Sequence, residues 1–347
     1  MLQFRNVALI ALLGAFGTCF DQADAQKASV ELEIYSVNSG LETQQTWGEL
    51  LSKVGANISS LKSARKNVKM EVDESTFGNR KHYRIVGVLS NNRLNLPGGK
   101  TFTNRDKEKI AAYIEAIRAD GPKTALSQKM AFGLTATQLV ALQQDLAALH
   151  KKSTKDTPVM DVVEAIAEAI KTPVRVDSSA RDALAKESKV AEEMNSLSCG
   201  TTLAAVLRPI GLVAVPKREQ GKTTEIVIMD SLKADEHWPV GWPSTRGNAL
   251  AVPSMFKSQK FEIRNYELKK ILDALESKVK VPFLYDHNTM ARHGADPTKL
   301  TATVVEQKQT FYGVVRKCLS QVRPQMKPEV RLDEAGNPFL WITTFKK

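Results

Sequence analysis

The feature that most constrains the fold is an internal repeat. Residues 159–177, VMDVVEAIAEAIKTPVRVD, align without a gap with residues 268–286, LKKILDALESKVKVPFLYD, at an offset of 109 residues. Apolar residues recur at helical spacing in the first part of each copy, and in the last part Val174 and Val176 match Phe283 and Tyr285 at the spacing of one strand face. Both copies end on an aspartate, at Asp177 and Asp286. A helix followed by a short strand is therefore predicted twice.

The repeat continues into a second helix. Residues 201–209, TTLAAVLRP, align with residues 309–317, QTFYGVVRK, and this alignment matches Arg208 with Arg316. The apolar positions of both stretches again follow the spacing of one helix face. Each copy thus contains two helices that share a predicted core.

The strands of the two copies are less alike. Each copy ends in a predicted hairpin, at 212–230 and 329–345. The second copy opens with a strand at 260–265 and has another at 299–307, whereas the corresponding opening stretch of the first copy, 151–156, is nearly all polar. The pattern predicts β-α-β-β-α-β-β-like modules, with the first copy divergent at its start.

With this pattern in view, the second copy resembles the secretin and TonB short N-terminal domain. That family has a short strand, a Leu-rich helix, a strand ending in Tyr-Asp, then a strand, a helix and a hairpin. The resemblance rests on Phe261, Ile263, Leu268, Ile271, Leu272, Leu275, Phe283, Tyr285, Asp286, Phe311, Val314 and Val315. The first copy is similar at Val162, Ile166, Val174, Val176, Asp177, Leu203, Leu207 and Leu212.

The resemblance implies a function of docking rather than catalysis. In that family the domain binds other proteins of the cell envelope and performs no chemistry. The chain is accordingly expected to be an exported, non-enzymatic interaction protein with an envelope protein as its partner, and with no cofactor, metal or nucleic acid.

The first residues predict export. Arg5 is followed by an apolar run at 7–20 that is too short to span a membrane, and Ala-Asp-Ala at 23–25 predicts a cut after Ala25. A lipoprotein anchor at Cys19 is disfavoured by the sequence before it. No later stretch reaches 18 apolar residues, so no stable membrane insertion is expected after signal cleavage.

The predicted organisation is α+β throughout. The first mature domain has strands at 28–37, 66–75 and 81–90, a helix at 46–55 and a helix capped by Thr103. Thr135 is predicted to cap a further helix. The predicted parts are a signal peptide at 1–25, an N-terminal α+β domain at 27–121, a helical connector at 122–150, modules at 151–230 and 260–345, and a linker at 231–259.

Composition and charge leave an electrostatic alternative. The formal net charge is +11, but lysine and arginine are spread along the chain without a long basic block. Binding of an anionic envelope polymer is therefore an alternative function. Cys199 and Cys318 hold non-equivalent places in the repeat, which argues against a disulfide between them.

Chemical motifs are weak. GKTT at 221–224 lacks the preceding glycine of a phosphate-binding loop and fits a hairpin turn. His287, His293 and Asp296 are the residues that a hydrolase or metal-dependent enzyme acting on envelope polymers would use, and this is the second alternative. Their spacing does not place the two imidazoles on one helix face.

Two sets of residues are candidates for a site. Trp238 and Trp242, beside His237, form a candidate interaction surface, and packing of this segment onto a module is the competing interpretation. Asp177 and Asp286 follow equivalent strands of the two copies, and they are predicted to cap the turns that come next rather than to transfer protons.

Overall fold

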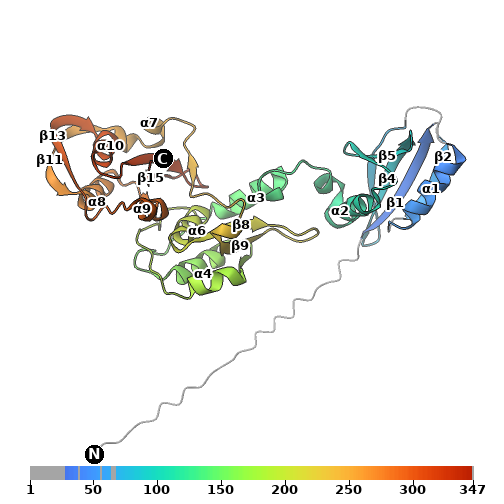
Figure 1. Ribbon diagram of the computed structural model, residues 1–347, viewed down its shortest axis with the longest axis horizontal. Helices are drawn as coiled ribbons and strands as arrows, with labels where there is room; N and C mark the ends of the chain where they lie inside the picture. Colours follow the sequence, from blue (N-terminus) through green and yellow to red (C-terminus); the bar gives the residue numbers. More distant parts are fainter. Residues whose placement is uncertain (1–27, 38–39, 55–56, 64–67, 346–347) are drawn as a thin grey trace, which may run out of the picture. The chain divides into compact units, whose positions relative to one another are not determined.

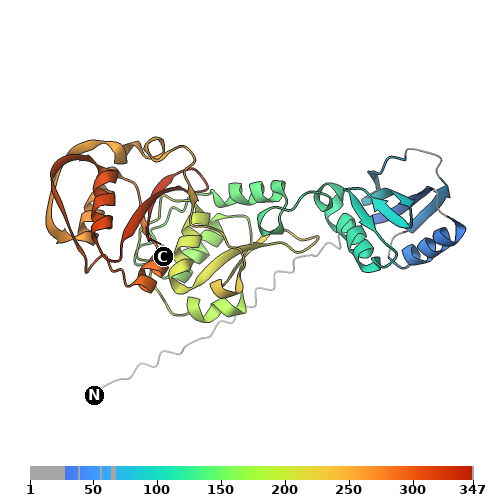
Figure 2. The ribbon, with the colours of Figure 1, turned by 45° about the horizontal axis from the view of Figure 1, so that its top comes forward.

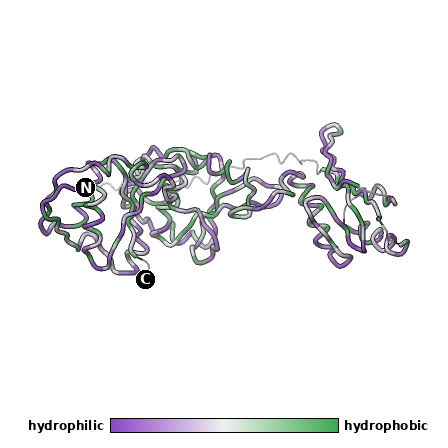
Figure 3. Tube along the Cα trace, turned by 90° about the horizontal axis from the view of Figure 1, so that it is seen from above, coloured by the Kyte–Doolittle hydropathy of each residue, from purple (hydrophilic) through white to green (hydrophobic). Residues whose placement is uncertain are grey.

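The computed structural model describes residues 28–37, 40–54, 57–63 and 68–345, in two compact units divided between Leu126 and Ser127 (Figure 1). Both units mix helices and strands, which confirms the predicted α+β class. The predicted signal peptide at 1–25 lies outside the described residues. No helix within the described ranges is both long and apolar enough to cross a membrane, and purple and green stretches alternate along the trace in Figure 3.

The first unit is a mixed sheet covered by helices. Its strands lie in the order β2-β1-β4-β5-β6, with β3 also paired to β4, and β1 runs parallel to both of its neighbours. The core of this unit includes Leu32, Trp47 and Ile114, each fully buried. The elements are β1 (Ser29–Val37), α1 (Leu41–Ser52), β2 (Asn57–Ser63), β3 (Val72–Phe77), β4 (Arg80–Ser90), β5 (Arg93–Leu96), β6 (Lys100–Phe102) and α2 (Lys107–Ala125).

Two local predictions in this unit were wrong. Strand β2 was not predicted, since NISSLKS lacks a clear apolar alternation. The N-cap of α2 is Asp106 rather than Thr103. The Asp106 carboxylate accepts hydrogen bonds from both the backbone N–H and the hydroxyl of Thr103, so the threonine orders the turn that precedes the helix.

The first part of the second unit contains the divergent copy of the repeat. Helices α4 and α6 pack against each other, and α6 contacts β8 (Figure 2). The elements are α3 (Ala136–Leu146), α4 (Val159–Ala169), β7 (Val174–Val176), α5 (Arg181–Leu184), α6 (Cys199–Leu207), β8 (Leu212–Lys217) and β9 (Glu225–Asp230).

The last part of the second unit contains the second copy. Strands β10 and β14 extend its sheet in the order β10-β14-β15-β12, and β11 pairs with β13. The elements are β10 (Trp242–Pro243), α7 (Asn248–Ala251), β11 (Ser258–Glu267), α8 (Leu268–Val279), β12 (Phe283–Tyr285), α9 (His287–His293), β13 (Thr301–Thr310), α10 (Phe311–Gln321), β14 (Met326–Leu332) and β15 (Pro338–Thr344).

The two copies share one topology. In the first, β7 runs parallel to β9 and β8 runs antiparallel to it. In the second, β12 runs parallel to β15 and β14 runs antiparallel to it. Each copy therefore folds as a helix, a strand, a second helix and a hairpin whose last strand occupies the centre, in agreement with the repeat seen in the sequence.

The second helices show that the sequence alignment is displaced by one turn. α6 follows Ser198 and α10 follows Thr310. Counted from these residues, Arg208 and Arg316 are not equivalent. A shift of about four residues keeps the same face buried, so the apolar pattern could not reveal it. The buried positions that match are Cys199, Thr202, Leu203, Val206 and Leu207 in α6 with Phe311, Val314, Val315, Cys318 and Leu319 in α10.

The opening strands diverge as the polar sequence of the first copy suggests. In the second copy β11 and β13 form a ladder from Ser258–Thr310 to Glu267–Thr301. In the first copy the corresponding stretches are joined by isolated bridges, Leu149–Ser198 and Pro158–Lys189. Between these bridges, the buried Thr154 hydroxyl donates to Glu192 O at 2.7 Å and accepts from Met194 N at 2.8 Å, in place of a regular ladder.

The segments before and between the copies pack on the second unit. Thr135 and Gln138 form a capping box at the start of α3, as predicted for Thr135, and Leu142 and Leu146 of α3 lie in the core of the first module. The stretch 231–259 was read as lacking regular elements, but it includes α7 and β10, and β10 pairs with β14. The proline and glycine residues of this stretch interrupt any apolar periodicity, so the sequence did not predict these short elements.

The equivalence of the modules can be tested by truncating matched core residues. Leu207 and Leu319 hold the same place in α6 and α10 and are both fully buried. Leu207→Ala and Leu319→Ala should each lower the free energy of unfolding by about 2–5 kcal/mol because each leaves a cavity. Urea denaturation measures the change. Leu232→Ala, at a side chain that is 93% exposed, is the control and should change the free energy of unfolding by less than about 0.5 kcal/mol. A loss of less than about 0.5 kcal/mol in either core variant would contradict the equivalence of Leu207 and Leu319.

Candidate functional site

The hairpin turn between β14 and β15 lies against the N-terminus of α6, and so joins the two modules. Asp333 Oδ2 accepts a hydrogen bond from Ser198 N at 2.8 Å. Glu334 Oε2 accepts from Thr201 N at 3.0 Å and from Thr201 Oγ1 at 2.8 Å. The first amides of a helix have no intrahelical acceptor, and this end of a helix favours negative charge. Carboxylates of the second module thus cap a helix of the first.

Glu334 also holds the segment between the modules. Its Oε1 accepts a hydrogen bond from Trp238 Nε1 at 2.6 Å. Burial raises the pKa of the Glu334 carboxyl, while the hydrogen bonds from Trp238 and Thr201 oppose that rise. One side chain therefore connects the hairpin turn, α6 and the Trp238 segment. The contacts between the two modules, of which these are the centre, form the joint.

A glycine in α6 permits this close approach. A Cβ on Gly200 would collide with Glu334 Oε1 and would lie 2.9 Å from Trp238 Nε1. Any larger residue at position 200 must displace the carboxylate from the amides that it caps. The contact with Glu334 and Trp238 therefore requires a glycine at position 200, whereas the helix itself does not.

Of the candidate surface residues Trp238, Trp242 and His237, Trp238 is not at the surface, and for it the competing interpretation, packing onto a module, holds. Trp238 is 4% exposed and packs between Phe132, at a ring-centroid distance of 5.9 Å, and Trp242, at 5.4 Å. Trp242 is half-buried and His237 is exposed. Trp238 therefore cannot present its ring to a partner, because its apolar area is already used to attach the segment to the modules.

Asp177 and Asp286 both accept hydrogen bonds from the backbone that follows them. Asp177 accepts from Ser179 N at 3.0 Å and Asp286 accepts from Thr289 N at 3.4 Å. Asp286 has a further partner, since Arg208 Nε donates to its Oδ1 at 2.9 Å. Burial opposes ionisation of Asp286, but the hydrogen bonds and charge of Arg208 outweigh it and lower the pKa of Asp286. The second copy thus uses this aspartate for a cross-module ion pair.

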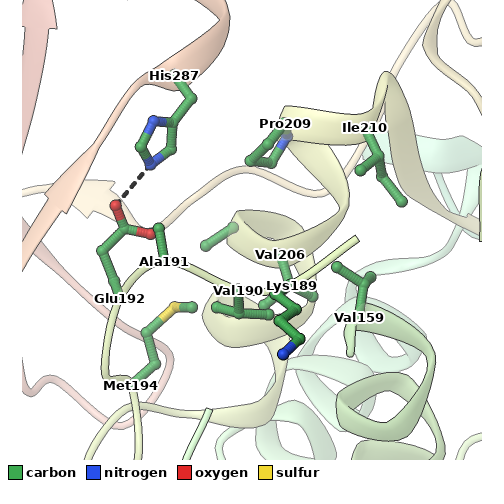
Figure 4. A pocket seen from close by; sticks show the side chains of 11 residues that line it. Val159, Lys189, Val190, Ala191, Glu192, Met194, Val206, Pro209, Ile210 and His287 are labelled. Carbon is green, nitrogen blue, oxygen red and sulfur yellow. Dashed lines mark hydrogen bonds and ion pairs between the residues drawn. The ribbon is translucent and has the colours of Figure 1, made fainter. Parts of the chain in front are cut away.

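A second ion pair crosses the modules beside the first. His287 Nε2 lies 2.5 Å from Glu192 Oε1 (Figure 4). The hydrogen bond with Glu192 raises the pKa of His287 above its ordinary value of 6.5, against the effect of burial, and the charge of Asp286 adds to the rise while Lys269 opposes it. This pair is therefore charged at mildly acidic pH.

A cavity of about 260 Å³ lies next to this pair in the first module (Figure 4). Its wall comes from the start of α4, the end of α6 and the 188–194 stretch, and His287 borders it from the second module. The lining is mainly apolar, with Val190, Met194 and Val206 buried. Apolar cavities with a small number of polar groups are typical of sites for small ligands.

The residues of the enzyme alternative do not converge. His287 faces Glu192, His293 Nδ1 lies 2.6 Å from Thr344 Oγ1, and Asp296 accepts hydrogen bonds from Thr298. Within the described residues no group of three or more His, Cys, Asp or Glu side chains could hold a metal ion. Cys199 and Cys318 are both buried free thiols, and burial raises the pKa of each to about 11.

Sequence reasoning missed most of the joint. Glu192, Arg208, Asp333 and Glu334 were not proposed as site residues, because their partners lie far away in the chain. The available signal was an acidic pair, Asp333-Glu334, in a predicted hairpin turn. That pattern indicates an exposed turn as readily as a cap for another module.

Comparison with known proteins adds no identification. A scan against protein-family models, a search of curated proteins and a search of solved structures each return no match. The resemblance to the secretin and TonB short N-terminal domain therefore stays a prediction.

Gly200→Ala tests the joint. The added methyl group should displace Glu334 and leave the Thr201 amide and the Trp238 indole N–H without their acceptor, at a cost of about 1–3 kcal/mol. Urea unfolding followed by tryptophan fluorescence measures the loss. Gly48→Ala in α1, where a Cβ meets nothing within 4 Å, is the control and should be neutral or stabilising by up to about 1 kcal/mol. Equal stability of the two variants would refute the joint.

The His287–Glu192 pair predicts a pH dependence. Because the folded pKa of His287 is raised, its contribution is complete below the ordinary pKa of 6.5 and is lost as the pH rises through the folded pKa. Stability should therefore fall between pH 6 and pH 8.5, by less than about 1 kcal/mol because the imidazole is partly exposed. The change is measured from the urea midpoints of the wild type and of His287→Gln at both pH values. If the stability of His287→Gln changes with pH as much as that of the wild type, this pair is not the cause.

Proposed function

We propose that the chain is an exported, non-enzymatic docking protein of the cell envelope, built on two tandem modules like the secretin and TonB short N-terminal domain. The apolar run at 7–20 and Ala-Asp-Ala at 23–25 support export. The common topology of the two copies supports the modular part. The observation that carries docking is a groove beside an unpaired strand edge in the second module.

The groove runs between β11 and α8 and has a volume of about 390 Å³. Residues from both faces of β11 line it, which is what a groove along a strand edge requires. Among the described residues β11 pairs with β13 alone, so its other edge offers free backbone groups. The floor is apolar and consists of Phe261, Ile263, Ile271, Leu275 and Phe311.

The rim of the groove carries more positive than negative charge. Arg264 and Lys270 are paired with Glu262 and Glu267 respectively, whereas Lys278 has no ion-pair partner among the described residues. Tyr266, 54% exposed, adds an aromatic ring to the rim. An extended protein segment with alternating apolar side chains and an acidic residue complements this surface. It would add to the edge of β11 through backbone hydrogen bonds and place its apolar side chains on the floor.

The test is a substitution that places a large side chain in the groove at an exposed position. Ala274 is an exposed residue of α8 that lines the groove, and Ser277 is an exposed residue of the same helix that does not. The mature chain, immobilised, is exposed to envelope extract, and the captured proteins are identified by mass spectrometry. We expect one envelope protein to bind the wild type and Ser277→Trp, and to bind Ala274→Trp at least tenfold less. Cross-linking should place an extended, acidic segment of that protein at β11.

Two results would contradict the proposal. Equal capture by Ala274→Trp would place binding elsewhere, and capture of no protein by the wild type would argue against docking. If instead an anionic polymer is retained, with affinity that falls steeply with salt and is unchanged in Ala274→Trp, the electrostatic alternative replaces docking. Circular dichroism of both tryptophan variants confirms that the chain is folded.

A further inference from the structure

The cavity of the first module lies where the first copy departs from the second. Counted between the matched bridges at their ends, the 189–198 stretch corresponds to β13, so Glu192 takes the place of Val304. Val304 is fully buried in the core of the second module. The Glu192 carboxylate instead turns outward to His287 at 2.5 Å. Glu192 therefore lines the cavity at a position where the second module has a buried valine.

The lining defines what the cavity can hold. Apolar side chains dominate it, including Val159, Val190, Val206 and Ile210 (Figure 4). An apolar cavity of about 150 Å³ holds one benzene molecule, so 260 Å³ accommodates about ten non-hydrogen atoms. An apolar body of that size gains free energy from burial here without any polar contact.

The polar groups at the cavity favour an anionic head. Where His287 is protonated it compensates the charge of Glu192, which then repels an anion little. Lys189 also lines the cavity, is exposed, and forms no ion pair with any described residue. One uncompensated positive charge therefore remains beside the apolar interior.

We propose that this cavity binds a small amphipathic anion, a monocarboxylate with a short unbranched apolar tail, whose tail enters the cavity and whose carboxylate pairs with Lys189. The site is separate from the groove between β11 and α8, and the proposal does not depend on docking. Because His287 of the second module borders the cavity, a bound tail contacts both modules and strengthens the joint between them.

The probe is octanoate, with octanol as its uncharged counterpart, titrated into the mature chain by isothermal titration calorimetry. Octanoate should bind at one site and raise the urea midpoint of unfolding. Lys189→Ala should weaken octanoate binding about tenfold, the loss expected for one charged hydrogen bond, and should leave octanol binding unchanged. Lys186→Ala, at an exposed lysine that does not line the cavity, should bind octanoate like the wild type.

A second variant tests whether the probes occupy the cavity, independently of the charge of Lys189. Ala191 is an exposed residue that lines the cavity, and Ala185 is an exposed residue that does not. Ala191→Trp should abolish binding of both probes by filling the cavity, whereas Ala185→Trp should not. The proposal is overturned if octanoate shows no saturable binding, if Lys189→Ala weakens both probes equally, or if Ala191→Trp binds like the wild type.

Discussion

The contact between the β14–β15 turn and the N-terminus of α6 is the constraint on which the second unit depends. A helix that begins without its own side-chain cap needs acceptors for its first amides, and Asp333 and Glu334 supply them from the other module. The same carboxylate fixes Trp238, which in turn packs on Phe132 and Trp242. Removing one acceptor would leave several buried donors unpaired, so the capped helix, the turn and the connecting segment are energetically coupled.

Duplication of one fold produced two modules with different surfaces. The second copy keeps a β11–β13 ladder and an apolar core, and residues of that core form the floor of its groove. The first copy replaces the ladder with two bridges and the side chain of Thr154, and it places Glu192 where the second has Val304. The conserved parts are the helix faces and the central parallel strand pair. The first copy lacks a regular ladder in the 189–194 stretch, and residues of that stretch line the cavity.

The sequence predicted what local periodicity determines. The helix faces of 159–170 and 268–279, the hairpins and the cap at Thr135 follow from side chains within a few turns of one another. Periodicity could not detect the one-turn displacement of α6, because an apolar stripe looks the same after a turn. It left open whether Trp238 is exposed or packs on a module, and it could not predict that Glu334 reaches Thr201, since both depend on how two separate modules pack. The candidate site was therefore predicted only at Asp286, His287 and the tryptophans, and for Trp238 the packing interpretation holds.

The joint combines apolar area with charge, and each contributes something different. Leu284, Phe339 and Trp341 of the second module belong to the hydrophobic core of the first, which provides attraction without direction. The carboxylates at α6, with Arg208–Asp286 and Glu192–His287, set the orientation because hydrogen-bonded ion pairs tolerate little displacement. The pKa of Asp286 is lowered and the pKa of His287 is raised, so a rising pH removes the charge of His287 and leaves that of Asp286. The apolar core and the Arg208–Asp286 pair therefore hold the modules together over the range of rising pH in which the histidine pair is lost.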